Sequence, residues 1–76
     1  MGMTVIARRV GAPADEVRYE FGFGDRFDRT LFIDPRTSEA RVEDGAFDAA
    51  ASAITAKVVN FWRDHGDFPQ RMLFAS

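Results

Sequence analysis

The sequence predicts an α+β fold: an antiparallel β-meander of three to four strands, then one C-terminal amphipathic helix packed on one face of the sheet, then a short extended tail. Two observations lead to this prediction. Apolar and polar residues alternate through the first half of the chain, which is the period of a half-buried strand. From residue 46 the apolar residues recur every three or four positions, which is the period of a helix. The 76 residues suffice for one core, so we expect a single domain, 1–76.

The first two strands are expected on either side of a breaker. Residues 3–10 are rich in β-branched side chains and end at the cluster Gly-Ala-Pro of residues 11–13. Residues 17–24 then alternate strictly, which places several aromatic side chains on one face. Gly22 and Gly24 belong to the other face of this alternation, and glycine within a strand indicates a bulge or a close approach of another backbone. The aromatic residues on the shared face are Tyr19, Phe21 and Phe23.

Two turns separate the following strands. Residues 24–28 combine glycine with aspartate and predict a turn, after which residues 29–34 alternate again. Asp34 followed by Pro35 favours a type I turn. Residues 39–43 then form the fourth strand of the predicted meander.

The helix is predicted from its apolar stripe and from its ends. Asp44 occupies the position expected for the N-cap, and Asp48 adds negative charge to the first turns. Gly66 occupies the position of a left-handed C-terminal cap. The stripe that should face the sheet consists of Phe47, Ala51, Ile54, Val58, Phe61 and Trp62.

The tail, residues 68–74, is too apolar to remain in water. It either returns across the helix or adds as a strand at a sheet edge, and the sequence leaves both arrangements open. One helix covers one face of a sheet, so the other face is left to Arg18, Glu20, Thr30, Phe32 and Arg41.

Composition limits the classes of function. The chain has no cysteine, which excludes disulfides and thiolate chemistry and fits a reducing compartment, so we expect a cytoplasmic protein. No window approaches the 18 apolar residues of a membrane span, and no membrane partner is expected. The net charge of −2 provides no field that would attract a polyanion.

Catalytic chemistry has little support in the sequence. His65, the single histidine, has flanking carboxylates and could serve as a general base or a metal ligand. Its position just before Gly66 favours a structural role, because an imidazolium interacts favourably with the C-terminal end of a helix. The acidic residues at 25–28 and 43–48 are explained by turns and caps. We therefore expect no enzyme, no metal and no cofactor.

The surplus of aromatic residues indicates an interaction surface. The chain has eight phenylalanines, more than one helix can cover, and contiguous apolar surface on a small chain usually marks a protein contact. We expect a non-enzymatic interaction or accessory module that self-associates as a homodimer or binds another protein. The residues expected at the contact are Phe27, Phe32, Arg41, Phe68, Arg71 and Phe74.

The alternative is a nucleic-acid-associated protein. An aromatic sheet face that carries arginine could stack single-stranded bases and contact phosphates, although the overall charge disfavours it. The arginines that would form such a patch are Arg8, Arg9, Arg18, Arg41 and Arg71.

Overall fold

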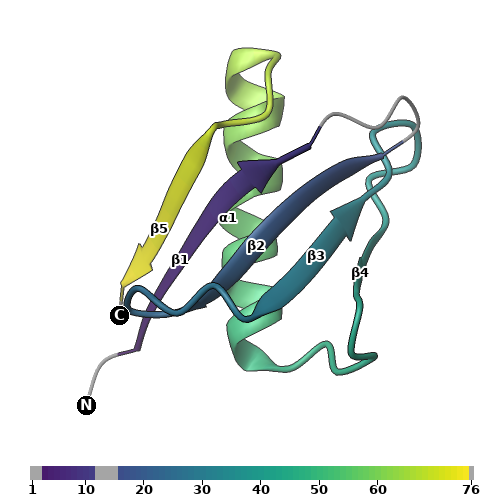
Figure 1. The fold of residues 1–76 in the computed structure, drawn as a ribbon. Helices are drawn as coiled ribbons and strands as arrows, with labels where there is room; N and C mark the ends of the chain where they lie inside the picture. Colours follow the sequence, from purple (N-terminus) through teal and green to yellow (C-terminus); the bar gives the residue numbers. More distant parts are fainter. Residues whose placement is uncertain (1–2, 12–15, 76) are drawn as a thin grey trace.

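In the computed structural model, which describes residues 3–11 and 16–75, five strands form one antiparallel sheet and one helix lies against it (Figure 1). This is the predicted α+β class. Pro13, expected to help end the first strand, lies outside the described residues. In chain order the elements are β1 (Thr4–Val10), β2 (Val17–Phe23), β3 (Arg29–Ile33), β4 (Ala40–Val42), α1 (Ala49–His65) and β5 (Arg71–Ala75).

The strand order is β4-β3-β2-β1-β5, so the first four strands form the predicted meander. The tail adds at the sheet edge as β5, which gives one strand more than the sequence predicts. Its register joins the two ends of the described chain, because Thr4 pairs with Ala75 and Arg8 with Arg71. The segment that contains α1 therefore crosses the sheet from one edge to the other.

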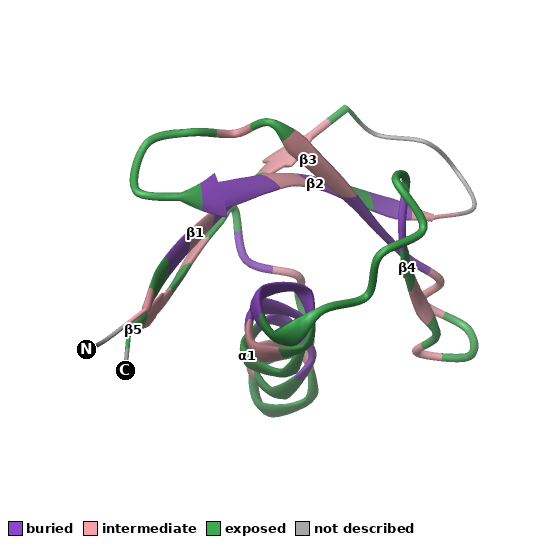
Figure 2. Cartoon of the chain, turned by 90° about the horizontal axis from the view of Figure 1, so that it is seen from below, coloured by how far each residue is buried: buried purple, intermediate pink, exposed green. Residues whose placement is uncertain are grey.

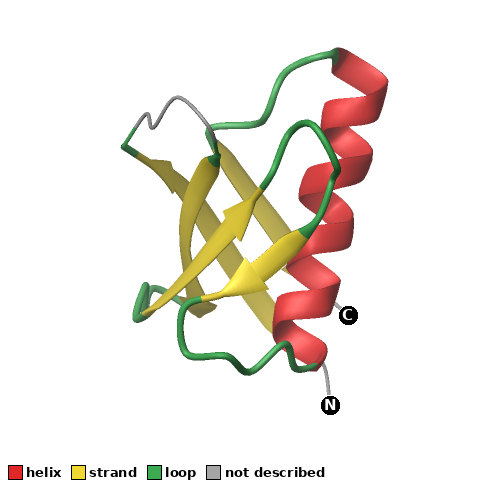
Figure 3. Cartoon of the chain, turned by 90° about the vertical axis from the view of Figure 1, so that its right-hand side faces the viewer, coloured by secondary structure: helices red, strands yellow, loops and turns green. Residues whose placement is uncertain are grey.

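The core lies between α1 and the sheet face that it covers (Figure 2). Seen from the side, sheet and helix form two layers (Figure 3). From the sheet, the buried apolar side chains are Val5, Ala7, Val17, Tyr19, Phe21, Leu31, Ile33 and Val42. From α1 they are Ala50, Ala51, Ile54, Val58 and Val59. The alternation predicted along the strands is therefore confirmed for this face, except that Phe23, the last residue of β2, is 54% exposed and does not join the core.

The helix begins one turn later than predicted. The prediction of Asp44 as N-cap is wrong, because Asp48 accepts a hydrogen bond from the backbone N–H of Ala51 at 3.0 Å. Arg29 of β3 explains the delay. Its Nε lies 3.0 Å from Asp44, its Nη1 lies 3.0 Å from Asp48, and its Nη2 donates to the carbonyl of Ala46 at 2.6 Å. These contacts hold the segment beside the sheet in a non-helical conformation.

The same contacts change the acidity of the two aspartates. The hydrogen bond from Arg29 lowers the pKa of Asp44 below its ordinary value. The backbone N–H of Ala51, followed by Arg29, lowers the pKa of Asp48. Both carboxylates therefore stabilise the folded chain in their charged form.

The predicted apolar stripe is largely confirmed. Ala51, Ile54 and Val58 are fully buried, and Trp62 packs against the core. Phe47 and Phe61 are the exceptions. Phe47 precedes the helix and remains 49% exposed, because the helix starts at Ala49. Phe61 does not join the core, and its ring stacks on His65. Within residues 3–11 and 16–75, no helix has the length and apolar character needed to cross a bilayer.

The end of α1 and the connection to β5 are fixed by three contacts. Gly66 adopts the predicted left-handed conformation, and its N–H donates to the carbonyl of Trp62. The ring of Phe68 stacks on that of Trp62, with centroids 4.7 Å apart. The hydroxyl of Tyr19 donates a hydrogen bond to the carbonyl of Pro69. Burial raises the pKa of Tyr19 to about 12, against the lowering effect of the charge on Arg9.

Candidate interaction surface

The sheet face away from α1 is here called the outer face, and no helix of the described residues covers it. The strand register places arginines, aromatic residues and short aliphatic residues on it, as the alternation of the sequence predicts. Its side chains gather in two clusters, one beside β4 and one beside β5.

The cluster beside β4 is centred on Phe32. Its ring lies 4.1 Å from the guanidinium carbon of Arg41 and 5.3 Å from that of Arg18. Arg41 also pairs with Glu16 at 3.4 Å. Phe32 is only 8% exposed, although it lies on the outer face, because these side chains cover it. Phe32 therefore supports two arginines and offers little apolar surface of its own.

The β2–β3 loop folds back over the outer face. A Cβ atom added to Gly22 would overlap the carbonyl oxygen of Arg26, so only glycine leaves room for this loop. The close backbone approach predicted from the glycines of this region is thus confirmed. The fold-back brings Phe27 under the guanidinium of Arg8, 4.1 Å from its ring centroid. Arg8 in turn pairs with Glu20 at 2.8 Å.

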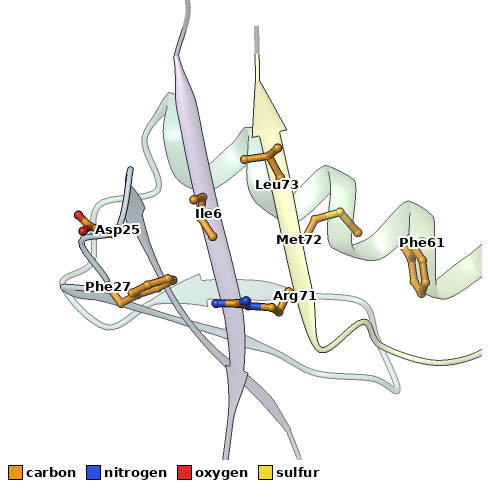
Figure 4. A pocket seen from close by; sticks show the side chains of 7 residues that line it. All are labelled: Ile6, Asp25, Phe27, Phe61, Arg71, Met72 and Leu73. Carbon is orange, nitrogen blue, oxygen red and sulfur yellow. The ribbon is translucent and has the colours of Figure 1, made fainter.

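Beside β5 this loop borders a hollow of about 640 Å³, here called the edge hollow (Figure 4). On the outer face it is lined by Ile6, Asp25, Phe27, Arg71 and Leu73. On the helix side of β5 it is lined by Phe61 and Met72. Because the lining comes from both faces of the sheet, the edge hollow extends around the border of β5. Most of its walls are apolar.

Leu73 is the most exposed apolar residue of this hollow. It is 52% exposed, although it lies within a strand. The alternation of β5 explains why: Met72 and Phe74 point toward the helix and pack against the core, so Leu73 must point outward.

The backbone of β5 presents an unpaired edge. In an antiparallel pair, alternate residues direct both backbone polar groups to the same neighbour. The N–H of Arg9 donates to the carbonyl of Gln70 at 2.8 Å, so Gln70, Met72 and Phe74 face β1. The N–H and C=O groups of Arg71, Leu73 and Ala75 therefore point away from the sheet. Within the described ranges no strand pairs with this edge.

Arg71 stands out electrostatically. On the outer face it lies directly opposite Arg8 in the β1–β5 register, and like charges in such a pair destabilise the sheet. Arg8 is compensated by Glu20, whereas Arg71 forms no ion pair with any residue that the structure describes. The edge hollow thus carries a guanidinium, Arg71, and a carboxylate, Asp25, neither of which forms an ion pair with a residue that the structure describes.

The six residues predicted for the contact do not form one patch. Phe27 and Arg71 come together in the edge hollow, whereas Phe32 and Arg41 form the separate cluster near β4. Phe68 and Phe74 turn toward the helix side and pack against the core. Sequence reasoning missed Ile6, Phe61 and Leu73. Once the tail is placed in the sheet, its alternation alone identifies Leu73.

The arginines proposed for a nucleic-acid surface are also divided. Arg9 lies on the helix side of the sheet, paired in register with Tyr19. Arg8 and Arg41 each pair with a carboxylate. Of the five, Arg18 and Arg71 are the outer-face arginines without an ion pair among the described residues.

His65 lines neither the Phe32 cluster nor the edge hollow, although it contacts Phe61 of the hollow. Its ring stacks on Phe61 with centroids 4.0 Å apart, and its Nδ1 lies 3.0 Å from the carbonyl oxygen of Phe61. These contacts fit the predicted role at the helix C-terminus. In the part of the chain that the structure describes, no three histidine or acidic side chains are arranged to hold a metal ion.

Comparison with known protein families, with curated proteins and with solved structures found no match to this chain. What the site can bind is therefore argued from its own groups. These are an unpaired strand edge, an apolar hollow around that edge, and one uncompensated arginine.

Proposed function

We propose that this chain is a non-enzymatic protein-interaction module that self-associates through the β5 side of its sheet. The observation that carries the proposal is the unpaired edge of β5, with its apolar hollow and the half-exposed Leu73. An exposed apolar edge strand is a template for pairing with another chain, and folded proteins usually cover or charge such an edge.

The two edges of the sheet support this choice of side. β4 is an edge of three residues, and short edge strands are a common means of preventing unwanted pairing. β5 has five residues, contains no proline and carries a single charge, at Arg71. The protection visible at β4 is thus missing at β5.

A protein partner is favoured over a nucleic acid. Phe32 is covered by its arginines, so it offers no free ring face for a base, and Phe27 is covered on one side by Arg8. Two of the four outer-face arginines are neutralised by carboxylates. Phosphate binding also depends on local positive charge, and the net charge of the chain is −2.

The test is the solution mass of the chain by light scattering during size-exclusion chromatography. We expect a species of twice the 8.5 kDa chain mass, at low and at high salt. Leu73→Ser should weaken the association, because burying the exposed half of a leucine contributes about 1 kcal/mol per copy. Because the substitution is present in both copies, the dissociation constant of the Leu73→Ser dimer should be about 30-fold higher than that of the wild type.

Phe47→Ser is the matched control. Phe47 is 49% exposed, close to the value for Leu73, but it lies in the segment that Arg29 holds against the other end of the sheet. Phe47→Ser should therefore leave the dissociation constant of the dimer unchanged. A wild-type chain that is monomeric at every concentration would refute self-association. If the chain instead binds single-stranded RNA, and raising the salt concentration weakens this binding, the nucleic-acid alternative is favoured.

A further inference from the structure

We infer that the open edge of β5, which the edge hollow borders, pairs with β5 of a second copy in antiparallel register about a two-fold axis that passes beside Leu73. The inference rests on the proposed self-association and specifies its geometry. Each β5 becomes an inner strand, and the two sheets join into one.

The direction of the backbone N–H and C=O groups along β5 selects this register. Only Arg71, Leu73 and Ala75 direct their backbone groups outward, so only these residues can exchange hydrogen bonds with a second strand. With Leu73 opposite Leu73, each Arg71 lies opposite the other copy's Ala75. All three outward residues then exchange both of their hydrogen bonds. A symmetric pairing shifted by one residue or more leaves at least one of the three outside the ladder.

The side chains agree with this register on both faces. On the outer face the two exposed Leu73 side chains meet at the axis. On the helix side each Met72 lies opposite Phe74 of the other copy, and methionine sulfur packs favourably against aromatic rings. Leu73 on the outer face and Phe61 on the helix side both line the hollow, so apolar side chains lie near the edge of β5 on both faces of the sheet.

The outward residues of β5 are complementary to themselves in this register, which favours a second copy as the partner, and charge does not oppose the pairing. The two Arg71 residues are four positions apart along the paired strands, about 13 Å, which exceeds the Debye length of about 8 Å at physiological ionic strength.

Cysteine cross-linking tests the register directly, because the natural chain has no cysteine. In the proposed dimer the two Cα atoms of residue 73 are about 5.5 Å apart, within the range of about 4.4–6.8 Å that a disulfide spans. Leu73→Cys should therefore form a disulfide-linked dimer under mild oxidation. A mixture of Arg71→Cys and Ala75→Cys should cross-link between the two variants at least tenfold faster than either does with itself.

Ser52→Cys is the control for random collision, because Ser52 is an exposed residue of α1. If light scattering finds a dimer but Leu73→Cys cross-links no faster than Ser52→Cys, the register is overturned and self-association stands. If the chain is monomeric and no variant cross-links above the control, both proposals fail. Preferential cross-linking at 73, together with the mixed 71–75 pair, supports the register.

Discussion

Replacing Tyr19 by Phe tests how the connection before β5 is held. Tyr19 is fully buried, and its hydroxyl donates to the carbonyl of Pro69, which is also buried. The variant keeps the ring and removes only the donor. The Pro69 carbonyl then loses its partner in the interior, two residues before β5 begins.

Two magnitudes follow from this contact. At neutral pH, a buried carbonyl left without a partner costs about 1–3 kcal/mol, and each kcal/mol lowers the melting temperature of a domain this size by about 4–8 °C. The second magnitude concerns alkaline pH. Burial in the folded chain raises the pKa of Tyr19 from the ordinary 10.0 to about 12. Between these values the unfolded chain has lost the proton and the folded chain retains it. The free energy of unfolding therefore falls by about 1.4 kcal/mol per pH unit from this group.

The assay is urea unfolding followed by the fluorescence of Trp62, the single tryptophan, at neutral pH and at intervals above pH 10. The alkaline loss due to Tyr19, about 3 kcal/mol in total, should be absent from Tyr19→Phe. Tyr19 is also the single tyrosine, so tyrosinate absorbance reports its titration in the folded chain. Titration at the ordinary pKa of 10.0, or an equal alkaline loss in the variant, would refute the reasoning.

Two further substitutions test the loop and the helix start. Gly22→Ala should destabilise the fold by about 1–3 kcal/mol in thermal unfolding, because its Cβ overlaps the Arg26 carbonyl, and an unchanged melting temperature would contradict this close approach. Asp48→Asn keeps a capping side chain but removes the charge beside Arg29. The wild type should melt higher at neutral pH, and this advantage should shrink as the pH falls below 3.8 through the lowered pKa of Asp48. An advantage that does not change with pH would contradict the charge argument.

The sequence predicts the elements of this fold well because their causes are local. Strand alternation, the apolar stripe of α1 and the glycine at position 66 each follow from neighbouring residues. The start of α1 could not be predicted in the same way. Asp44 and Asp48 are both suitable caps, and the choice is made by Arg29, which belongs to a strand 15 and 19 residues earlier.

The candidate site was less predictable, because it depends on contacts between distant segments. The alternation of β3 predicts that Phe32 points to the outer face, and it does. Two arginines from neighbouring strands nevertheless cover its ring. The edge hollow needs β5 beside β1 and the β2–β3 loop over Gly22. Neither arrangement has a signature within a single segment, so the exposure of Leu73 could not be predicted from the sequence alone.

The pairing of β5 with β1 also affects how the chain reaches its native state. Thr4 and Ala75 are neighbours in the sheet but lie near opposite ends of the sequence. Contacts of such long sequence separation slow folding, because loop closure costs entropy before the contact forms. The meander and α1 can assemble from nearer neighbours, and we expect docking of β5 to come last. Until then the outer edge of β1 is open, and β5 of another molecule could occupy it, which makes strand exchange a hazard during refolding at high concentration.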